Sequence, residues 1–292
     1  MSVCPWCNNE SNHLYLKVKD YFLTQEEFAV FECEHCHLLF TEPRPAHDKI
    51  GSYYQSDDYY SHQENTKGFI PKIYEAVKSV NLRNKVRIAL NGLEAGDLLD
   101  IGCGVGDFLL QASKLNWRIK GIEPSEVAGR IASKKLGFKP LLPSESSCIP
   151  SASMDAVTMW HVLEHVDDLH LQISEIVRVL KPGGRLVLAL PNFKSYDAVY
   201  YKEQWAAWDV PRHLNHFCLD SLNSLVQPAG FTLDNVTKLK WDAYYISYLS
   251  EKYRHHRMPL LRGAVIGFKS NWLARSSGQY SSLVYVYTKK DS

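Results

Sequence analysis

Two apolar segments joined by a glycine-rich turn constrain the fold of this chain most. Leu98–Ile101 has the pattern of a buried strand, and the turn with glycine at 102, 104 and 106 follows it directly. Such glycines let the backbone pass close under a ligand, where a β-carbon would clash. A second apolar strand ends at Glu123, about 20 residues later, where a carboxylate accepts both hydroxyls of a ribose. The pattern predicts an α/β sheet that binds a nucleoside-containing cofactor at its carboxyl edge.

The spacing after the turn disfavours a dinucleotide cofactor. The dinucleotide fingerprint has a glycine two residues after Val105, where this chain has Asp107. Downstream, Met154–Trp160 has the pattern of a buried strand that runs into the polar turn His161–His165. An amphipathic helix over 169–180 follows, and then a glycine turn and another apolar strand.

In this order, the motifs resemble those of class I S-adenosylmethionine (SAM) methyltransferases, in the branch that contains the ubiquinone-biosynthesis O-methyltransferases. The resemblance covers residues 95–235. It implies a Rossmann-like, seven-stranded sheet, largely parallel, with helices on both faces. It also implies methyl transfer from SAM to a small molecule, with a sugar or quinone-like hydroxyl favoured as acceptor. Methylation of RNA or protein, and SAM sensing without turnover, are the alternatives.

The resemblance also suggests which residues contact SAM. Asp100 is the usual partner of the cofactor's ammonium group; the alternative is a cap on the amides of the turn. Glu145 lies where relatives place an acid against the adenine, although the local sequence departs from their pattern. Trp160 either stacks near the adenine or belongs to the core. The predicted cofactor-binding residues are Asp100, Gly102, Cys103, Gly104, Gly106, Glu123, Pro124, Glu145, Ser146 and Trp160.

A hydroxyl acceptor must lose a proton, which requires a base or a metal ion. The turn supplies His161, Glu164 and His165 beyond the fourth strand, and His213 follows the fifth. These four are the predicted catalytic residues. The set resembles the Glu-x-x-Glu-His cluster of magnesium-dependent ubiquinone O-methyltransferases, which small-RNA ribose methyltransferases share in similar form.

The role of these four residues stays open at this point. His161 replaces the first glutamate of the cluster, and histidine favours softer ions than magnesium. One hypothesis is a catalytic divalent metal ion, and another is deprotonation of the acceptor by His165 or His213. The third is that Glu164 caps a helix, as in relatives that bind no catalytic metal.

Two CxxC pairs predict a structural zinc site in an N-terminal ribbon. Each pair can turn two thiolates toward one tetrahedral ion, and the second pair closes the site with no open position. The ligands are Cys4, Cys7, Cys33 and Cys36. A redox pair or disulfides are the alternatives, which cytosolic conditions disfavour. The other cysteines, Cys103, Cys148 and Cys218, are expected to be small buried residues.

Charge argues against nucleic acid as a partner. Residues 1–45 hold three Lys or Arg against seven Asp or Glu, a net charge of −4 that repels phosphates. The whole chain has a formal net charge of +1. Its first residues lack the basic and apolar segments of a signal peptide, and no apolar run reaches about 18 residues. We therefore expect a cytoplasmic protein with a small-molecule substrate; the oligomeric state is not readable.

The domain boundaries follow from composition. We expect a zinc ribbon over 1–45, a tyrosine-rich linker and helix over 46–94, and the methyltransferase domain over 95–292. The helix, from about 71 to 90, is expected to fold over the methionine end of SAM. The tyrosines either line a substrate pocket or pack between the ribbon and the domain; they are Tyr53, Tyr54, Tyr59 and Tyr60.

Two later segments carry further expectations. Tyr200–Trp208 has enough aromatic surface to hold a ring or a sugar face, or else it is a packed helix. A helical insert at about 240–275, with its flanks, carries eight Lys or Arg against Asp242 and Glu251, interleaved with apolar residues. It is expected to bind an anionic substrate, such as a nucleotide-linked sugar, or to touch an anionic membrane surface. The alternative is a solvated face over the core.

Overall fold

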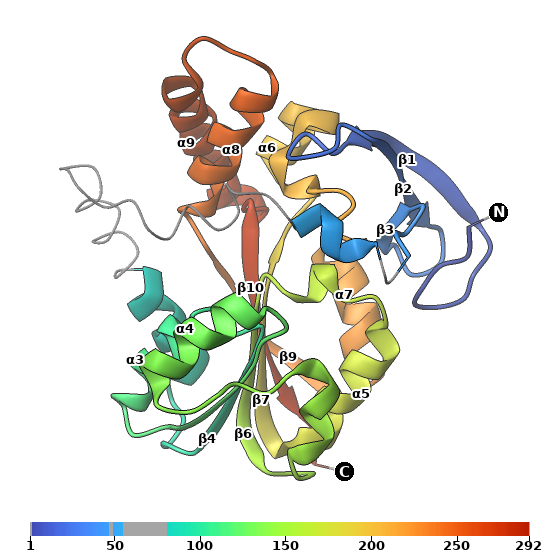
Figure 1. Cartoon of the computed structure of the whole chain (residues 1–292). Coiled ribbons are helices and arrows are strands. Elements are labelled where there is room, and N and C mark those ends of the chain that lie inside the picture. Colours follow the sequence, from blue (N-terminus) through green and yellow to red (C-terminus); the bar gives the residue numbers. More distant parts are fainter. Residues whose placement is uncertain (1, 47–48, 55–80, 292) are drawn as a thin grey trace.

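A six-stranded sheet forms the centre of the computed structural model, which describes residues 2–46, 49–54 and 81–291 (Figure 1). Four neighbouring strands are parallel, and the C-terminal strand β10 lies antiparallel between two others. The order is β5-β4-β6-β7-β10-β9. The strands are β4 (Asp97–Ile101), β5 (Arg118–Ile122), β6 (Met154–Trp160), β7 (Leu180–Pro191), β9 (Phe231–Lys238) and β10 (Ser282–Lys289).

The α/β class and the mixed, largely parallel sheet are confirmed, but within the described residues this central sheet has six strands instead of seven. Beyond β5, Leu141 makes a single parallel bridge to Ile122. Two residues later, Pro143 lies where the next N–H of this ladder would donate. Proline has no N–H, so the pairing cannot extend past this point.

Helices cover both faces of the sheet, as the sequence predicts. On one face, the helix over 81–90 and α3 (Asp107–Ser113) share an apolar cluster with Leu98, Ala156 and Val187. On the other, α5 (Leu169–Val179) and α7 (Leu219–Val226) pack with the alternate strand residues, among them Leu99 and Val157. The alternation follows from the two-residue period of strands. α4 (Glu126–Leu136) follows β5. Residues 71–80 of the expected helix lie outside the described residues.

The N-terminal ribbon is not a separate sheet. It forms β1 (Asn12–Lys19), β2 (Glu27–Cys33) and β3 (Leu39–Glu42), and β8 (Asn215–His216) adds to the β3 edge. Thr41 Oγ1 donates to the backbone oxygen of His213 at 2.8 Å and lies 2.9 Å from His216 Nε2. The ribbon cysteines and Phe40 belong to the same apolar cluster as α5 and α7. A strand from the methyltransferase part therefore completes the ribbon.

The segment Tyr200–Trp208 packs into the interior instead of offering an aromatic face. It contains the end of α6 (Tyr196–Tyr201) and two short 3-10 turns, η4 (Lys202–Gln204) and η5 (Ala206–Trp208). Trp205 and Trp208 are buried, and the Trp205 indole donates to Asp197. The packed alternative is therefore the observed one.

The expected burial of the remaining cysteines is wrong at one position. Cys103 and Cys218 are buried, but Cys148 is exposed. Cys148 ends the 3-10 turn η2 (Pro143–Cys148), none of whose residues is buried.

The insert forms two helices, α8 (Asp242–Tyr253) and α9 (Pro259–Ser277), which pack against each other at the upper end of the molecule in Figure 1. Gly263 and Gly267 of α9 face α8 so closely that a β-carbon would lie 2.7 and 2.8 Å from the Cα atoms of Tyr248 and Tyr244. None of the helices in the described ranges is both long and apolar enough to cross a bilayer.

This close approach predicts that Gly267→Ala lowers the free energy of unfolding by about 1–3 kcal/mol, because the added methyl group meets backbone atoms that must shift. Gly129→Ala in α4 is the matched control. Nothing lies within 4 Å of its added β-carbon, so helix propensity should raise stability by about 0.5–1 kcal/mol. Chemical denaturation of both variants measures the difference; equal effects would contradict the packing.

Candidate functional site

The glycine turn and Glu123 form one rigid unit at the carboxyl ends of β4 and β5. Gly102 has a φ of +72°, and a β-carbon there would lie 2.4 Å from Val162 Cγ2, so only glycine fits. The buried Glu123 carboxylate accepts hydrogen bonds from the N–H groups of Gly104, at 2.7 Å, and Ser125, at 2.8 Å. Each oxygen keeps a further lone pair. The carboxylate is thus held in a fixed orientation and can still accept hydroxyl groups.

Asp100 is a buried carboxyl that accepts a hydrogen bond from the Thr158 hydroxyl at 2.6 Å. Burial raises the pKa of Asp100 to about 7, and the nearby Lys85 only partly opposes this effect. Lys85 comes from the helix over 81–90, and burial lowers the pKa of its own ammonium. A cation delivered to this position would therefore find a carboxyl that ionises to receive it.

The other residues predicted to contact the cofactor are placed less uniformly. Cys103 is buried against Gly121, and Pro124 is exposed. The exposed Glu145 accepts a hydrogen bond from the Leu142 N–H and so caps its own 3-10 turn, with the half-buried Ser146 beside it. Trp160 is half-buried, with Phe108 at 5.4 Å between ring centroids and the Lys85 ammonium 4.8 Å from its ring.

Three of the four predicted catalytic residues converge. One ligand atom from each of Glu164, His165 and His213 lies within 4.8 Å of the others. His165 Nδ1 is 3.0 Å from the backbone oxygen of Arg212, and His213 Nδ1 is 2.9 Å from that of Ala207. Because a carbonyl oxygen only accepts, both Nδ1 atoms carry the proton, which leaves a lone pair on each Nε2. We call these three residues the Glu-His-His cluster.

Glu164 is the unusual member of the Glu-His-His cluster. It is 1% exposed, and neither carboxylate oxygen accepts a hydrogen bond from the described residues. Burial works to raise its pKa, but His161 and the cluster histidines outweigh burial and hold the pKa below the usual value. A cavity of about 10 Å³, room for roughly one water molecule, lies against Glu164 and His213. The Glu164 oxygens and the two imidazole Nε2 atoms could therefore accept a proton or bind a small cation.

The ligand atoms of the Glu-His-His cluster indicate which metal ions this site could bind. Two imidazole nitrogens and one carboxylate, with each imidazole fixed through its other nitrogen, suit a divalent ion such as zinc, iron or manganese better than magnesium. Both Glu164 oxygens lack a donor among the described residues, so the cluster fits such an ion. When bound, the ion would lower the pKa of an acceptor hydroxyl.

His161 stands on the other side of Glu164, outside the cluster. Its backbone has a φ of +58°, its Nδ1 lies 3.5 Å from Glu164, and its Nε2 lies 3.2 Å from Asp242 at the start of α8. Burial works to lower the pKa of His161, but the two carboxylates outweigh it and raise the pKa to about 9. A protonated imidazole has no lone pair, so His161 is suited to fixing Glu164 and the insert instead of accepting a proton.

Arg212 is a residue of the site that the sequence did not indicate. Its buried guanidinium donates to Asp20 of the ribbon and to Asp209, both at 2.7 Å, and to the backbone oxygen of Tyr53. The Arg212 carbonyl in turn fixes His165. Arg212 thereby joins ribbon and cluster, the ribbon through its side chain and the cluster through its backbone oxygen.

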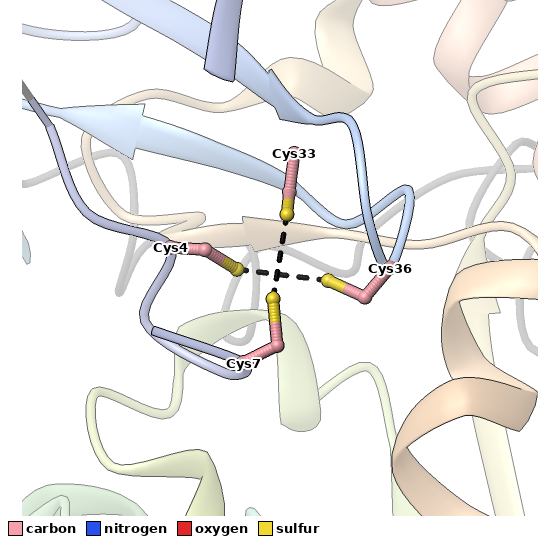
Figure 2. Close-up of side chains that lie close together, drawn as sticks. All are labelled: Cys4, Cys7, Cys33 and Cys36. Carbon is pink, nitrogen blue, oxygen red and sulfur yellow. Dashed lines mark hydrogen bonds between the residues drawn. The ribbon is translucent and has the colours of Figure 1, made fainter. Parts of the chain in front are cut away.

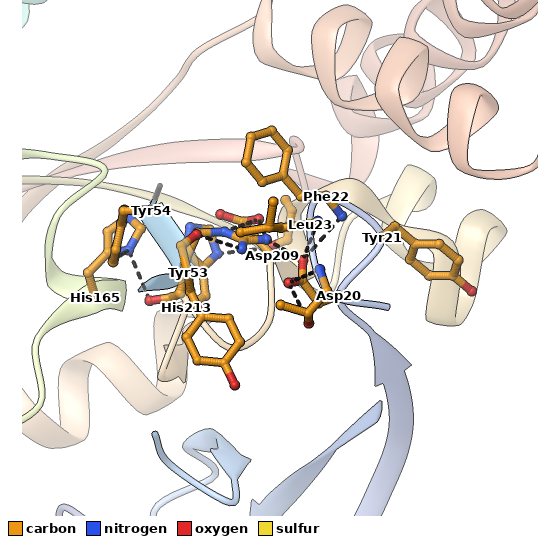
Figure 3. Close-up of polar contacts among 12 residues, drawn as sticks. Asp20, Tyr21, Phe22, Leu23, Tyr53, Tyr54, His165, Asp209 and His213 are labelled. Atoms are coloured by element: carbon orange, nitrogen blue, oxygen red, sulfur yellow. Dashed lines mark hydrogen bonds and ion pairs between the residues drawn. The ribbon is translucent and has the colours of Figure 1, made fainter. Parts of the chain in front are cut away.

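The two described tyrosines of the linker make different contacts. Tyr53 donates to Glu26 of the ribbon, whereas the Tyr54 hydroxyl lies 3.1 Å from His165 Nδ1, as Figure 3 shows. Tyr59 and Tyr60 lie outside the described residues.

The four ribbon cysteines converge as the spacing predicts (Figure 2). Their sulfur atoms all lie within 4.8 Å of one another, with Cys4 to Cys36 at 3.6 Å and Cys7 to Cys33 at 3.4 Å. Tetrahedral zinc with Zn–S bonds near 2.3 Å separates its sulfurs by about 3.8 Å, whereas a disulfide needs about 2.05 Å. The arrangement fits zinc.

Comparison with known proteins defines the class. The family model described as a methyltransferase domain matches residues 74–236, more than half of the chain, so the chain belongs to this family. The ubiquinone biosynthesis O-methyltransferase of Bradyrhizobium sp. (strain ORS 278) is 29% identical over 163 residues, covering 49% of this chain and 64% of that protein. The mitochondrial ubiquinone biosynthesis O-methyltransferase of Mus musculus is 28% identical over 164 residues, covering 50% and 44%.

The match spans less than two thirds of the length of either relative. Among solved structures, geranyl diphosphate C-methyltransferase from Streptomyces coelicolor A3(2) aligns with a TM-score of 0.57 at 16% identity, covering 83% of this chain and 97% of that one. At this identity the likeness concerns the fold alone.

The cysteine geometry predicts about one zinc ion per chain, measured by atomic emission on the purified protein. Cys36→Ser should lose the zinc and lower the melting temperature, because the site holds the two knuckles of the ribbon together. Cys148→Ser, at an exposed cysteine, is the control and should retain both. Wild-type protein that binds no zinc and keeps the four ribbon cysteines as free thiols would contradict the assignment.

Proposed function

We propose that this chain transfers a methyl group from SAM to a small-molecule acceptor, most simply to a hydroxyl on a sugar or quinone-like ring. The observation that carries the proposal is the position of the Glu-His-His cluster beside the glycine turn. Val162, which a β-carbon on Gly102 would strike, is two residues before Glu164. A cofactor held by the turn and an acceptor held at the cluster would meet at one edge of the sheet.

The residues divide the work of binding SAM. Glu123 accepts the ribose hydroxyls with the lone pairs that its backbone donors leave free. Asp100 receives the ammonium group, and Trp160 flanks the adenine side of the site beside Phe108. Alignment of the acceptor oxygen behind the sulfonium methyl group can supply up to ~7–11 kcal/mol of the rate enhancement.

His213 is the proposed general base. Burial and the neighbouring His213 lower the pKa of His165 to about 4, so His165 is neutral but a weak proton acceptor. His213 offers its Nε2 beside the same carboxylate and borders the cavity of the cluster. In this scheme Glu164 stabilises the imidazolium that forms on His213, while His165 and Tyr54 fix the geometry.

Transfer of label from radioactive SAM into host extract tests the proposal. The extract is separated into water-soluble, lipid, nucleic-acid and protein pools. Label in the water-soluble or lipid pool supports a small-molecule acceptor and separates sugar-like from quinone-like candidates. Label confined to RNA or protein contradicts the proposal.

The raised pKa of Asp100 leads us to expect that SAM affinity depends on pH. Its raised pKa of about 7 leaves the carboxyl neutral below that pH and charged above it, so attraction to the ammonium increases with pH. SAM should bind roughly eightfold more tightly at about pH 7.5 than at about pH 6. Asp100→Asn should weaken binding and abolish this difference, measured by calorimetry.

The control for this pH dependence is Asp97→Asn, at the opposite end of the same strand, where Asp97 pairs with Arg118. This variant should keep the wild-type pH profile. A wild-type affinity that is flat or falls over this range would contradict the role of Asp100.

The assignment of His213 as general base predicts how substitutions in the cluster affect kcat. His213→Ala should lower kcat about 10²–10⁴-fold while SAM affinity is unchanged, because deprotonation of the acceptor is lost but the cofactor contacts remain. His165→Ala should also lower kcat, since it removes a ring that packs 4.6 Å from His213. His13→Ala, on the exposed β1 strand, is the control. Full activity in both cluster variants would contradict the assignment.

A further inference from the structure

Helix α9 exposes its large apolar side chains and buries its small residues, the reverse of an ordinary surface helix. The side packed inward consists of small residues, and the side turned outward consists of large apolar ones. The buried residues are Gly263, Gly267, Ser270 and Ala274. Between 57% and 61% of each outward side chain is exposed in Leu261, Val265, Phe268 and Trp272. We call these four the apolar stripe.

The reversal is built into the packing of the insert. Each stripe residue is two positions from a buried small residue, and two positions correspond to about 200° around an α-helix. The glycine contacts with Tyr244 and Tyr248 leave no room for larger side chains on the inward face. The helix therefore cannot turn its apolar stripe toward α8, and Leu260 and Met258 extend the exposed apolar surface at its start.

The charges of the insert border this stripe. Helix α9 carries Arg262, Lys269 and Arg275 and no acidic residue. Several cations expected to form a basic patch are instead used internally. Lys238, Arg254 and Lys269 lie over the tyrosine rings of neighbouring elements, and Arg262 pairs with Glu251. Exposed Lys240, Arg257 and Arg275 remain around the apolar stripe.

We propose that α9 docks on an anionic bilayer surface, with the apolar stripe at the boundary between headgroups and acyl chains. A helix of 19 residues, about 28 Å long, that combines Leu, Phe and Trp with flanking Lys and Arg has the composition of an interfacial helix. The exposed cations would meet anionic headgroups. A two-fold dimer through the same face would instead bring like charges together without an acid to pair them.

The position of α8 and α9 suggests why the protein would dock on a membrane, an argument that rests on the proposed function. Asp242, the first residue of α8, pairs with His161 at the candidate site. A membrane under α9 would therefore lie near the edge of the sheet where the acceptor is proposed to bind. The docking itself needs neither SAM nor an acceptor, so it can be tested separately.

The experiment is co-sedimentation of the full chain with vesicles of phosphatidylcholine alone or mixed with phosphatidylglycerol. Wild-type protein should bind the mixed vesicles and bind the neutral ones less. The double variant Phe268→Gln/Trp272→Gln should partition at least about tenfold more weakly, because two large apolar contacts are lost. The control is Leu115→Gln/Leu171→Gln. These two residues lie outside α9 and are 54% and 60% exposed, so this variant should bind vesicles like wild type.

Three results would overturn the proposal. The first two are failure of wild-type protein to bind the mixed vesicles and equal binding by the α9 variant. The third is a concentration-dependent dimer in analytical ultracentrifugation that the α9 variant abolishes, without vesicle binding; this would assign the apolar stripe to a second copy of the chain.

Discussion

The buried guanidinium of Arg212 is the interaction on which the arrangement of the candidate site depends. The guanidinium joins Asp20 in the ribbon to Asp209 beside the Glu-His-His cluster, and the backbone oxygen of Arg212 accepts a hydrogen bond from His165. Removal of one partner from a buried ion pair costs about 3–5 kcal/mol, because a desolvated charge is left alone. The ribbon is therefore part of the structure that positions the cluster, and β8 extends this connection through Thr41.

Two kinds of chemistry meet at one edge of the sheet. At β4 and β5, the carboxyl groups of Glu123 and Asp100 present acceptors for a sugar and a cation, and backbone N–H groups hold Glu123 in place. After β6, a buried carboxylate and two imidazole lone pairs present acceptors for a proton or an ion. The close contact between Gly102 and Val162 sets the separation of these two sites. Parallel strands that end together explain why segments far apart in sequence meet here.

Local patterns carried the predictions that were confirmed. The strand, glycine turn and acid predicted the α/β sheet, and the CxxC spacing predicted the cluster of Cys4, Cys7, Cys33 and Cys36. The contacts of Asp242 and Asp20 could not be read in this way, because each depends on a partner about 80 or more residues away. Nor could the outward apolar stripe, since its orientation is set by how closely Gly263 and Gly267 approach α8.

The decisive measurement is the structure of the chain bound to S-adenosylhomocysteine. We expect the ribose hydroxyls on Glu123, the amino group toward Asp100, and the sulfur facing the Glu-His-His cluster. A ligand bound elsewhere, or a sulfur that points away from His213, would contradict the proposed site.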